Sequence, residues 1–208
     1  MKNIWNNLYY IIANIWNIEQ PDINYDYYTR ISTDNFYSTN DWYLNHPEAI
    51  MPSRSNGARL KLIQLSNNKF TFPTITSKIN ITNGCVIIKP TLSKSKNVIH
   101  TFLLRHTNEN IGFEITSNKI FVVAFNKIIP FKLFNPDDDH SFEIEINPKT
   151  NMIFWRVNNI TIYELKKKSI ELKSIVISLV AKGKITASEF PIAFQLKSVD
   201  ILTHKELQ

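Results

Sequence analysis

The chain has 208 residues, with 24 Lys and Arg against 18 Asp and Glu, which gives a formal net charge of +6 at pH 7. Hydrophobic residues at 43% and charged residues at 20% are ordinary globular values, so a disordered or collagen-like chain is excluded. This length favours one domain core. The single cysteine, Cys85, excludes an internal disulfide, and its apolar neighbours predict a buried core position.

The basic residues are dispersed apart from one run, Lys166 to Lys168. A nucleic-acid-binding domain is expected to cluster its basic residues around a recognisable motif, so nucleic acid is not favoured as a partner and the run is interpreted as a solvated loop. No stretch of about 18 apolar residues predicts a transmembrane helix. The N-terminus lacks a convincing signal-peptide cleavage site, so a cytoplasmic or virion-associated location is favoured over secretion.

Residues 1–20 have the period of an amphipathic helix, with Asn side chains opposite an apolar stripe. The candidate docking residues of that stripe are Trp5, Leu8, Ile12 and Trp16. The helix is expected to end before Pro21 and to be followed by a connector, residues 21–30, and by the main domain, residues 31–208. The stripe either packs on its own domain or docks into a protein partner or a second copy of the chain, as in a homo-oligomer. Membrane contact is a third alternative.

From residue 31 onward the period changes to two. Residues 142–146 alternate apolar side chains with Glu143 and Glu145, which predicts a half-buried strand with both glutamates on a solvated outer face. Other runs are apolar on both faces and are expected to be inner strands of a sandwich. These runs are residues 98–104, 120–125, 128–134 and 175–180.

Two further strands are predicted to form a tight hairpin. Residues 152–157 and 160–165 are joined by Asn158 and Asn159, two residues that tolerate positive φ. Short strands at intervals of about 8 to 12 residues, with no second helical pattern of similar quality, predict an all-β protein. The expected fold is a two-sheet antiparallel β-sandwich of the jelly-roll type with a short N-terminal amphipathic helix.

Several segments occur in the order found in one known superfamily. Thr33-Asp34-Asn35-Phe36 with the following Asp41-Trp42-Tyr43 is similar to an opening "D-x-F … W", and residues 81–88 are similar to a "v-x-x-G-x-L-x-I" strand. Residues 139–146 and 153–159 match an "H-x-y-x-i-x-w … i-x-f-y-v-D-G" hairpin, and residues 192–202 match the closing strand "v-D-y-v-x-v". The chain thus resembles the concanavalin A-like lectin and glucanase jelly roll, in its laminin G-like or family-sixteen glycoside-hydrolase-like form.

The resemblance implies a catalytic segment that the sequence does not contain. Retaining glucanases of this family carry "E-x-D-x-x-E" on one strand, because two carboxyls about 5 to 5.5 Å apart must flank the cleaved bond. The strands where this segment should fall, residues 111–116 and 120–125, offer only Glu114. No enzymatic activity is therefore expected, and a divergent glycoside hydrolase is kept as a third function. Glu143 and Glu145 are the nearest substitute pair.

No cofactor is expected, and the candidate metal ion is Ca²⁺. Asp137 and Asp139 could donate oxygens to Ca²⁺, although acids that follow Pro136 are equally typical of a polar turn.

Two functions from different classes remain. The first is a non-catalytic module for glycan recognition or adhesion, in which Trp42, Tyr43, Trp155 and Arg156 contact the carbohydrate. Core packing is the alternative for Trp42 and Trp155, because Trp usually buries its large ring. The second function is a structural or assembly component of a virion, phage or surface, anchored through residues 1–20. Fold alone does not decide between them.

Overall fold

The computed structural model describes most of the main domain. The described residues are 28–34, 36, 40–53, 57–66, 69–79, 81–105, 109–125, 127–131, 138–167 and 174–204. The helix predicted for residues 1–20, with Trp5, Leu8, Ile12 and Trp16, lies outside these residues, and so does Asp137.

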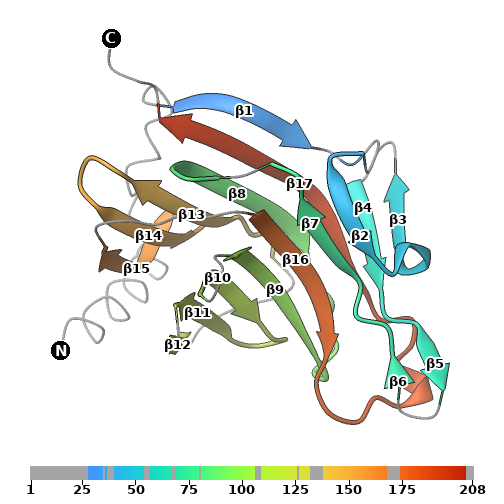
Figure 1. Ribbon diagram of the computed structural model, residues 1–208. Coiled ribbons are helices and arrows are strands. Elements are labelled where there is room, and N and C mark those ends of the chain that lie inside the picture. The colour runs from blue at the N-terminus through green and yellow to red at the C-terminus, as the bar shows by residue number, and fades with distance from the viewer. Residues whose placement is uncertain are drawn as a thin grey trace.

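Two large antiparallel sheets make up the fold, as the sequence predicts (Figure 1). The first, of eight strands, has the order β15 (Ile160–Lys166), β14 (Met152–Val157), β13 (Phe142–Asn147), β8 (Gly84–Thr91), β17 (Ala193–His204), β4 (Gly57–Lys61) and β3 (Ile50–Ser53), with β1 (Tyr28–Asp34) also paired to β17. The second, of seven strands, has the order β12 (Lys127–Phe131), β11 (Ile120–Ala124), β10 (Asn110–Ile115), β9 (Val98–Arg105), β16 (Ser174–Ala181), β7 (Thr74–Ser77) and β2 (Trp42–Asn45).

The remaining elements are short. β5 (Gln64–Ser66) pairs with β6 (Lys69–Phe70), and two single-turn 3-10 helices are η2 (Pro47–Ala49) and η3 (Ala187–Glu189). β1 begins at Tyr28, inside the range that the sequence assigns to the connector. Within the described part of the chain, no helix is long and apolar enough to cross a membrane.

The two sheets bury one apolar core between them. Phe102 of β9 and Phe142 of β13 belong to different sheets, and their ring centroids lie 5.3 Å apart. Trp155 of β14 is fully buried in the same core. Each such aromatic side chain contributes roughly 1.5 to 3 kcal/mol through burial. Burial of the inward-facing apolar side chains therefore holds the two sheets face to face.

The hairpin predicted from Asn158 and Asn159 is confirmed. β14 pairs with β15 across these two residues, whose φ angles are 51° and 64°. Both residues therefore adopt the left-handed backbone conformation, and a turn of this kind matches the twist of the flanking strands. The side-chain oxygen of Asn158 accepts a hydrogen bond from the backbone N–H of Ser141 at 2.8 Å, which ties the turn to the start of β13.

One strand expected inside the sandwich lies at its edge. The prediction for residues 128–134 is wrong, because β12 covers Lys127–Phe131 and is the last strand of the seven-stranded sheet. Ile128 is 58% exposed. Pro130 has no N–H to donate to a further strand, which suits an edge position.

The interpretation of Glu143 and Glu145 is wrong in one respect. Both lie on the outer face of β13, as expected, because Phe142, Ile144 and Ile146 fill the core between the sheets. Neither glutamate is solvated, however, since both side chains are buried. Burial raises the pKa of Glu143 above its usual value. The hydrogen bond that the Ser141 hydroxyl donates to this carboxylate acts in the opposite direction and lowers the pKa.

Candidate functional site on the seven-stranded sheet

A row of polar side chains crosses the outer face of the seven-stranded sheet. The core takes Ile111, Phe113 and Ile115 of β10, so Glu114 points to the opposite face. The backbone register places Glu114 opposite Thr101 of β9, and Thr101 opposite Ser178 of β16. Thr74 of β7 and Asn45 of β2 continue the row beyond Ser178.

The centre of this row is organised by side-chain hydroxyls. The hydroxyls of Thr101 and Ser178 form a hydrogen bond to each other, and both side chains are buried. Paired hydroxyls of this kind satisfy each other inside a sheet and fix both rotamers. Glu114, only partly buried beside them, is a carboxylate held on a rigid strand.

Glu114 has no second carboxylate beside it on β10. The other outward residues of the strand are Asn110 and Gly112. Glu109, five residues before Glu114, precedes β10 and lies outside its pairing with β9. The carboxylate of Glu109 instead binds the Lys167 ammonium, with an O···N distance of 2.9 Å. Among the described residues, the paired carboxyls of a retaining glucanase are therefore not assembled on this strand.

Gly112 permits a close approach of two strands at the site. Its φ is 150°, and a Cβ placed there would lie 2.0 Å from the carbonyl oxygen of Phe102. A side chain at this position would thus push β10 away from β9. Gly112 is itself buried, so the close approach of the two strands leaves no gap at this position.

An exposed aromatic ring stands at the β2 end of the face. Tyr43 is 65% exposed and points outward, opposite Thr76, while the Lys78 ammonium lies 5.2 Å from the centre of its ring. A ring in this position can stack on the apolar face of a ligand and hold a cation at the same time.

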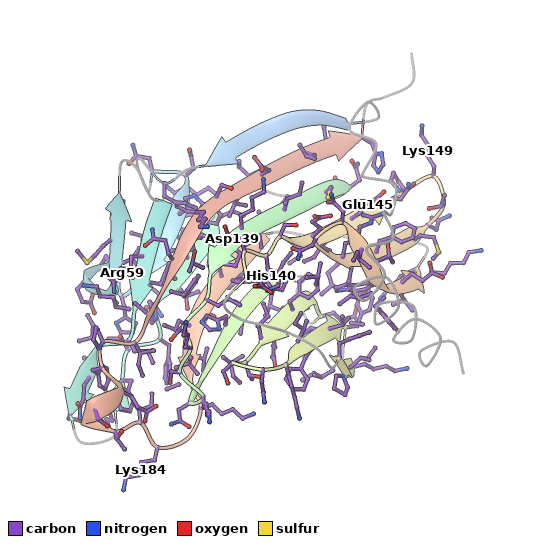
Figure 2. The ribbon with its side chains drawn as sticks, turned by 180° about the vertical axis from the view of Figure 1, so that it is seen from behind. Arg59, Asp139, His140, Glu145, Lys149 and Lys184 are labelled. Atoms are coloured by element: carbon purple, nitrogen blue, oxygen red, sulfur yellow. The ribbon has the colours of Figure 1, made fainter. Side chains whose placement is uncertain are left out.

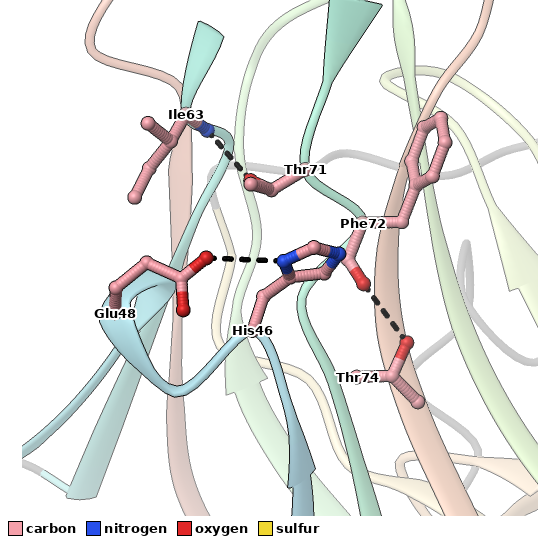
Figure 3. A network of polar contacts seen from close by, with 6 residues as sticks. All are labelled: His46, Glu48, Ile63, Thr71, Phe72 and Thr74. Atoms are coloured by element: carbon pink, nitrogen blue, oxygen red, sulfur yellow. Dashed lines mark hydrogen bonds and ion pairs between the residues drawn. The ribbon is translucent and has the colours of Figure 1, made fainter. Parts of the chain in front are cut away.

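The loops next to this end are fixed by local hydrogen bonds (Figure 3). The His46 ring donates from Nδ1 to the Glu48 carboxylate at 3.0 Å, directly after β2. The Thr71 hydroxyl accepts from the backbone N–H of Ile63 at 2.9 Å. The Thr74 hydroxyl, a member of the polar row, donates to the carbonyl of Phe72 at 3.1 Å. These bonds position β2 and β7 where the row leaves the sheet.

The structure does not bring together the four residues that the sequence selects for ligand binding. Trp42 and Trp155 lie in the core, where neither ring can stack on a sugar. Arg156 lies on the outer face of the eight-stranded sheet, bound to Glu145. Tyr43 is the member of the set that lies on the outer face of the seven-stranded sheet.

Of the two candidate calcium ligands, Asp139 lies next to His140 and contacts β17 of the eight-stranded sheet (Figure 2). Asp139 binds the Lys197 ammonium at 2.7 Å, and this contact lowers the pKa of its carboxyl. Asp137 lies outside the described residues. No group of three or more His, Cys, Asp or Glu side chains suited to a metal ion occurs in the described ranges.

A surface cavity of about 460 Å³ lies beside Asp139 and His140. Lys89 and Lys197 also line it, and none of its described lining residues is a Trp, Tyr or Phe. The cavity therefore has charged groups but no stacking platform, and it does not include the polar row.

Sequence reasoning missed the hydroxyl pair of the row. Ser178 is the one polar residue of the run 175–180, and Thr101 shares the run 98–104 with one other polar residue, His100. A lone hydroxyl at an outward position of such a run is a usable signal, because an unpaired hydroxyl in a buried strand carries a desolvation penalty. The pairing itself joins residues 77 positions apart, so it required the fold.

Comparisons with known proteins give the fold. No protein-family model matches the sequence, and a search of curated proteins found no match. The structure of a Bacillus licheniformis β-glucanase is similar with a TM-score of 0.71 at 16% identity, covering 84% of this chain and 98% of that one. A non-specific endo-β-1,3(4)-glucanase from family GH16 has a TM-score of 0.74 at 9% identity, covering 89% of this chain and 94% of the other. A laminarinase from Rhodothermus marinus has a TM-score of 0.72 at 13% identity, covering 86% and 98%.

These matches confirm the concanavalin A-like jelly roll that the motif order predicts. They also correct the expectation that the chain is not an enzyme, since all three similar structures are those of glucanases or laminarinases, and a transglycosylase is similar as well, with a TM-score of 0.69. That expectation was based on the missing "E-x-D-x-x-E" segment.

Proposed function

We propose that this protein acts on a polysaccharide of the β-glucan class, which binds along the outer face of the seven-stranded sheet, and that Glu114 is the carboxyl that transfers protons to or from the bound glycan. The observation that carries the proposal is the polar row through Glu114, Thr101 and Ser178 on one face of a glucanase-like sandwich. Adjacent strands are about 4.8 Å apart, so a row over five strands extends for about 19 Å.

The groups of this face match the chemistry of a carbohydrate. Thr74, Asn45 and Glu114 offer donors and acceptors for sugar hydroxyls, and Tyr43 offers an exposed ring. Glu114 supplies one carboxyl of the two that hydrolysis through a paired mechanism needs. We therefore assign the proton-transfer role to Glu114. No residue of β10 is proposed as the nucleophile.

The test is turnover of soluble β-1,3- and mixed-linkage glucans, measured by release of new reducing ends and by the size distribution of the products, which also detects transfer between chains. We expect activity in the wild-type protein and a loss of at least about 100-fold in Glu114→Gln, the lower range for general acid–base catalysis. The matched control is Glu164→Gln, the same substitution at an exposed position opposite Phe154 on the other sheet.

Three results would count against the proposal. Turnover that is equal in the wild-type protein and in Glu114→Gln would remove Glu114 from the reaction. Binding of a glucan without any turnover would contradict the catalytic part, and absence of binding to every glucan would contradict the whole.

A further inference from the structure

The outer face of the eight-stranded sheet carries a small apolar cluster that is separate from the core. Cys85 and Ile87 of β8 and Leu202 of β17 form it, and all three are buried. The intervening residues Val86 and Ile201 point into the core between the sheets. The cluster is thus on the side of the sheet that faces away from the sandwich.

Buried carboxylates border this cluster. Glu143 and Asp200 lie opposite Ile87 on either side, and Glu145 lies opposite Cys85. Glu143 is 1% exposed, and Glu145 and Asp200 are each 5% exposed. Acidic side chains are almost never this deeply buried on an uncovered sheet face, so the face needs a cover.

Two polar atoms at the same place remain unsatisfied. Oε2 of Glu143 and Nη1 of Arg156 are buried and have no hydrogen-bond partner in the described part of the chain. Buried polar groups in native proteins are nearly always paired. The cover should therefore bring hydrogen-bonding side chains as well as apolar ones.

The described elements do not provide a second layer here. Among them, the extensive contacts of β8, β13 and β17 are with their neighbours in the same sheet. The first described residue, Tyr28, lies beside this face, so residues 1–27 are the candidate for the cover.

We infer that residues 1–27 dock on the outer face of the eight-stranded sheet of their own chain, with the apolar stripe over Cys85, Ile87 and Leu202. The connection supports this occupant. β1 begins at Tyr28, opposite His204, and continues with Arg30 opposite Leu202, so β1 starts beside the end of β17 that carries Leu202 (Figure 1).

The composition of the segment supports it as well. The stripe contains Trp5, Leu8, Ile12 and Trp16, and the other side contains Asn3, Asn6, Asn7, Asn14 and Asn17. Indole and aliphatic groups suit the apolar cluster, and amide side chains can both donate to Glu143 and accept from Arg156. One segment thus supplies both kinds of group that the face lacks.

The length of the segment is also sufficient. A helix of 17 residues is about 25 Å long. The five strands from β17 through β8, β13 and β14 to β15 are separated by four gaps of about 4.8 Å, so this half of the sheet is about 19 Å wide. A helix lying across these strands would reach over both the cluster and Glu145, which lies on β13 (Figure 2).

Cys85 is a reporter for this contact, because it is the only cysteine and is 0% exposed. Burial raises the pKa of its thiol, with a further increase from the nearby Glu143 carboxylate, and the thiolate is the reactive form. The experiment measures the rate at which a soluble aromatic disulfide reagent modifies Cys85 in the folded, full-length protein. We expect the double variant Trp5→Ser, Trp16→Ser to be modified at least tenfold faster than the wild-type protein.

The matched control places two serines on the other side of the same segment, as Asn7→Ser, Asn14→Ser. Its rate should equal that of the wild-type protein. Equal rates for the stripe variant and the wild-type protein, with the β-rich circular dichroism spectrum retained, would overturn the inference. Equal acceleration in the control would also overturn it, since protection would then not depend on the apolar stripe. Wild-type protection that is lost on dilution would assign the cover to a second copy and overturn docking within one chain.

A second measurement applies if the stripe variant does not fold. Leu8→Cys, Ile12→Cys and Trp16→Cys are made singly in the full chain, and each protein is oxidised. We expect at least one of them to form a disulfide with Cys85 within a monomer, identified by peptide mapping. Disulfides found only between chains, or none in all three variants, would overturn the inference.

Discussion

The ring of His100 accepts a hydrogen bond at Nε2 from the backbone N–H of Ser93, with an N···N distance of 3.0 Å. Its Nδ1 donates to the carbonyl of Ile115 at 3.2 Å, and the ring meets Phe194 edge to face at a centroid distance of 5.3 Å. His100 is fully buried. The imidazole is therefore neutral, with its proton on Nδ1, and it joins β9 to β10 and to the loop after β8.

This burial predicts a pH dependence of stability. Desolvation lowers the pKa of His100 to about 4 in the folded protein, against about 6.5 in an unfolded chain. The unfolded state thus binds the proton more tightly, so the free energy of unfolding falls as pH decreases from about 6.5 to about 4. The loss attributable to this group is about 3 kcal/mol.

The measurement is urea unfolding at pH 7, 5.5 and 4 for the wild-type protein and His100→Gln. Glutamine can offer one donor and one acceptor without titrating. The wild-type protein should lose about 3 kcal/mol more than the variant over this range. Parallel pH profiles would contradict a neutral, buried His100, since contributions of other groups such as Glu143 are common to both proteins.

The ion pair between Arg156 and Glu145 gives a second prediction. The pair is largely buried, with side-chain exposures of 14% and 7%. Arg156→Met removes the cation beside a buried carboxylate and should reduce the free energy of unfolding by about 3 kcal/mol, whereas adding Glu145→Gln should recover part of that loss. Chemical denaturation of the four proteins of this cycle measures the coupling. Additive losses in the double variant would contradict a coupled pair.

The Asn158-Asn159 turn gives a third prediction, on the stability of the hairpin. The φ of 64° at Asn159 is tolerated by Asn and Gly but not by a β-branched residue. Asn159→Val should therefore destabilise the protein by about 1 to 2 kcal/mol, and Asn159→Gly should be close to neutral. Thermal denaturation compares the two variants. Equal melting temperatures for Val and Gly at this position would show that the left-handed conformation does not limit stability.

Features that depend on neighbouring residues could be predicted from the sequence, whereas features that depend on contacts between distant segments could not. The Asn158-Asn159 hairpin and the alternation around Phe142 are local, and both were predictable because turn chemistry and period two are written in consecutive residues. The edge position of β12 could not be predicted, because an apolar pair such as Ile128-Ile129 occurs in edge strands and in inner strands alike. Which strands become neighbours depends on pairings between distant segments.

The same distinction holds for the candidate site. Tyr43 was predictable as an exposed aromatic, and Glu114 as the one carboxylate of its strand. The bond between Thr101 and Ser178 depends on strands that meet only after folding. Trp42 and Trp155 could be placed in the core or at a ligand from sequence alone, because a large ring serves either purpose.

Calorimetric titration with a soluble β-glucan measures whether a glycan binds along the outer face of the seven-stranded sheet, as proposed. The variants are Tyr43→Ala, on that face, and Met51→Ala, which removes a comparably exposed apolar side chain from β3 of the other sheet. We expect Tyr43→Ala to weaken binding about tenfold, the effect of roughly 1.4 kcal/mol of lost stacking, and Met51→Ala to bind like the wild-type protein. Equal affinity of all three proteins, or no heat of binding to any β-glucan, would contradict the proposal.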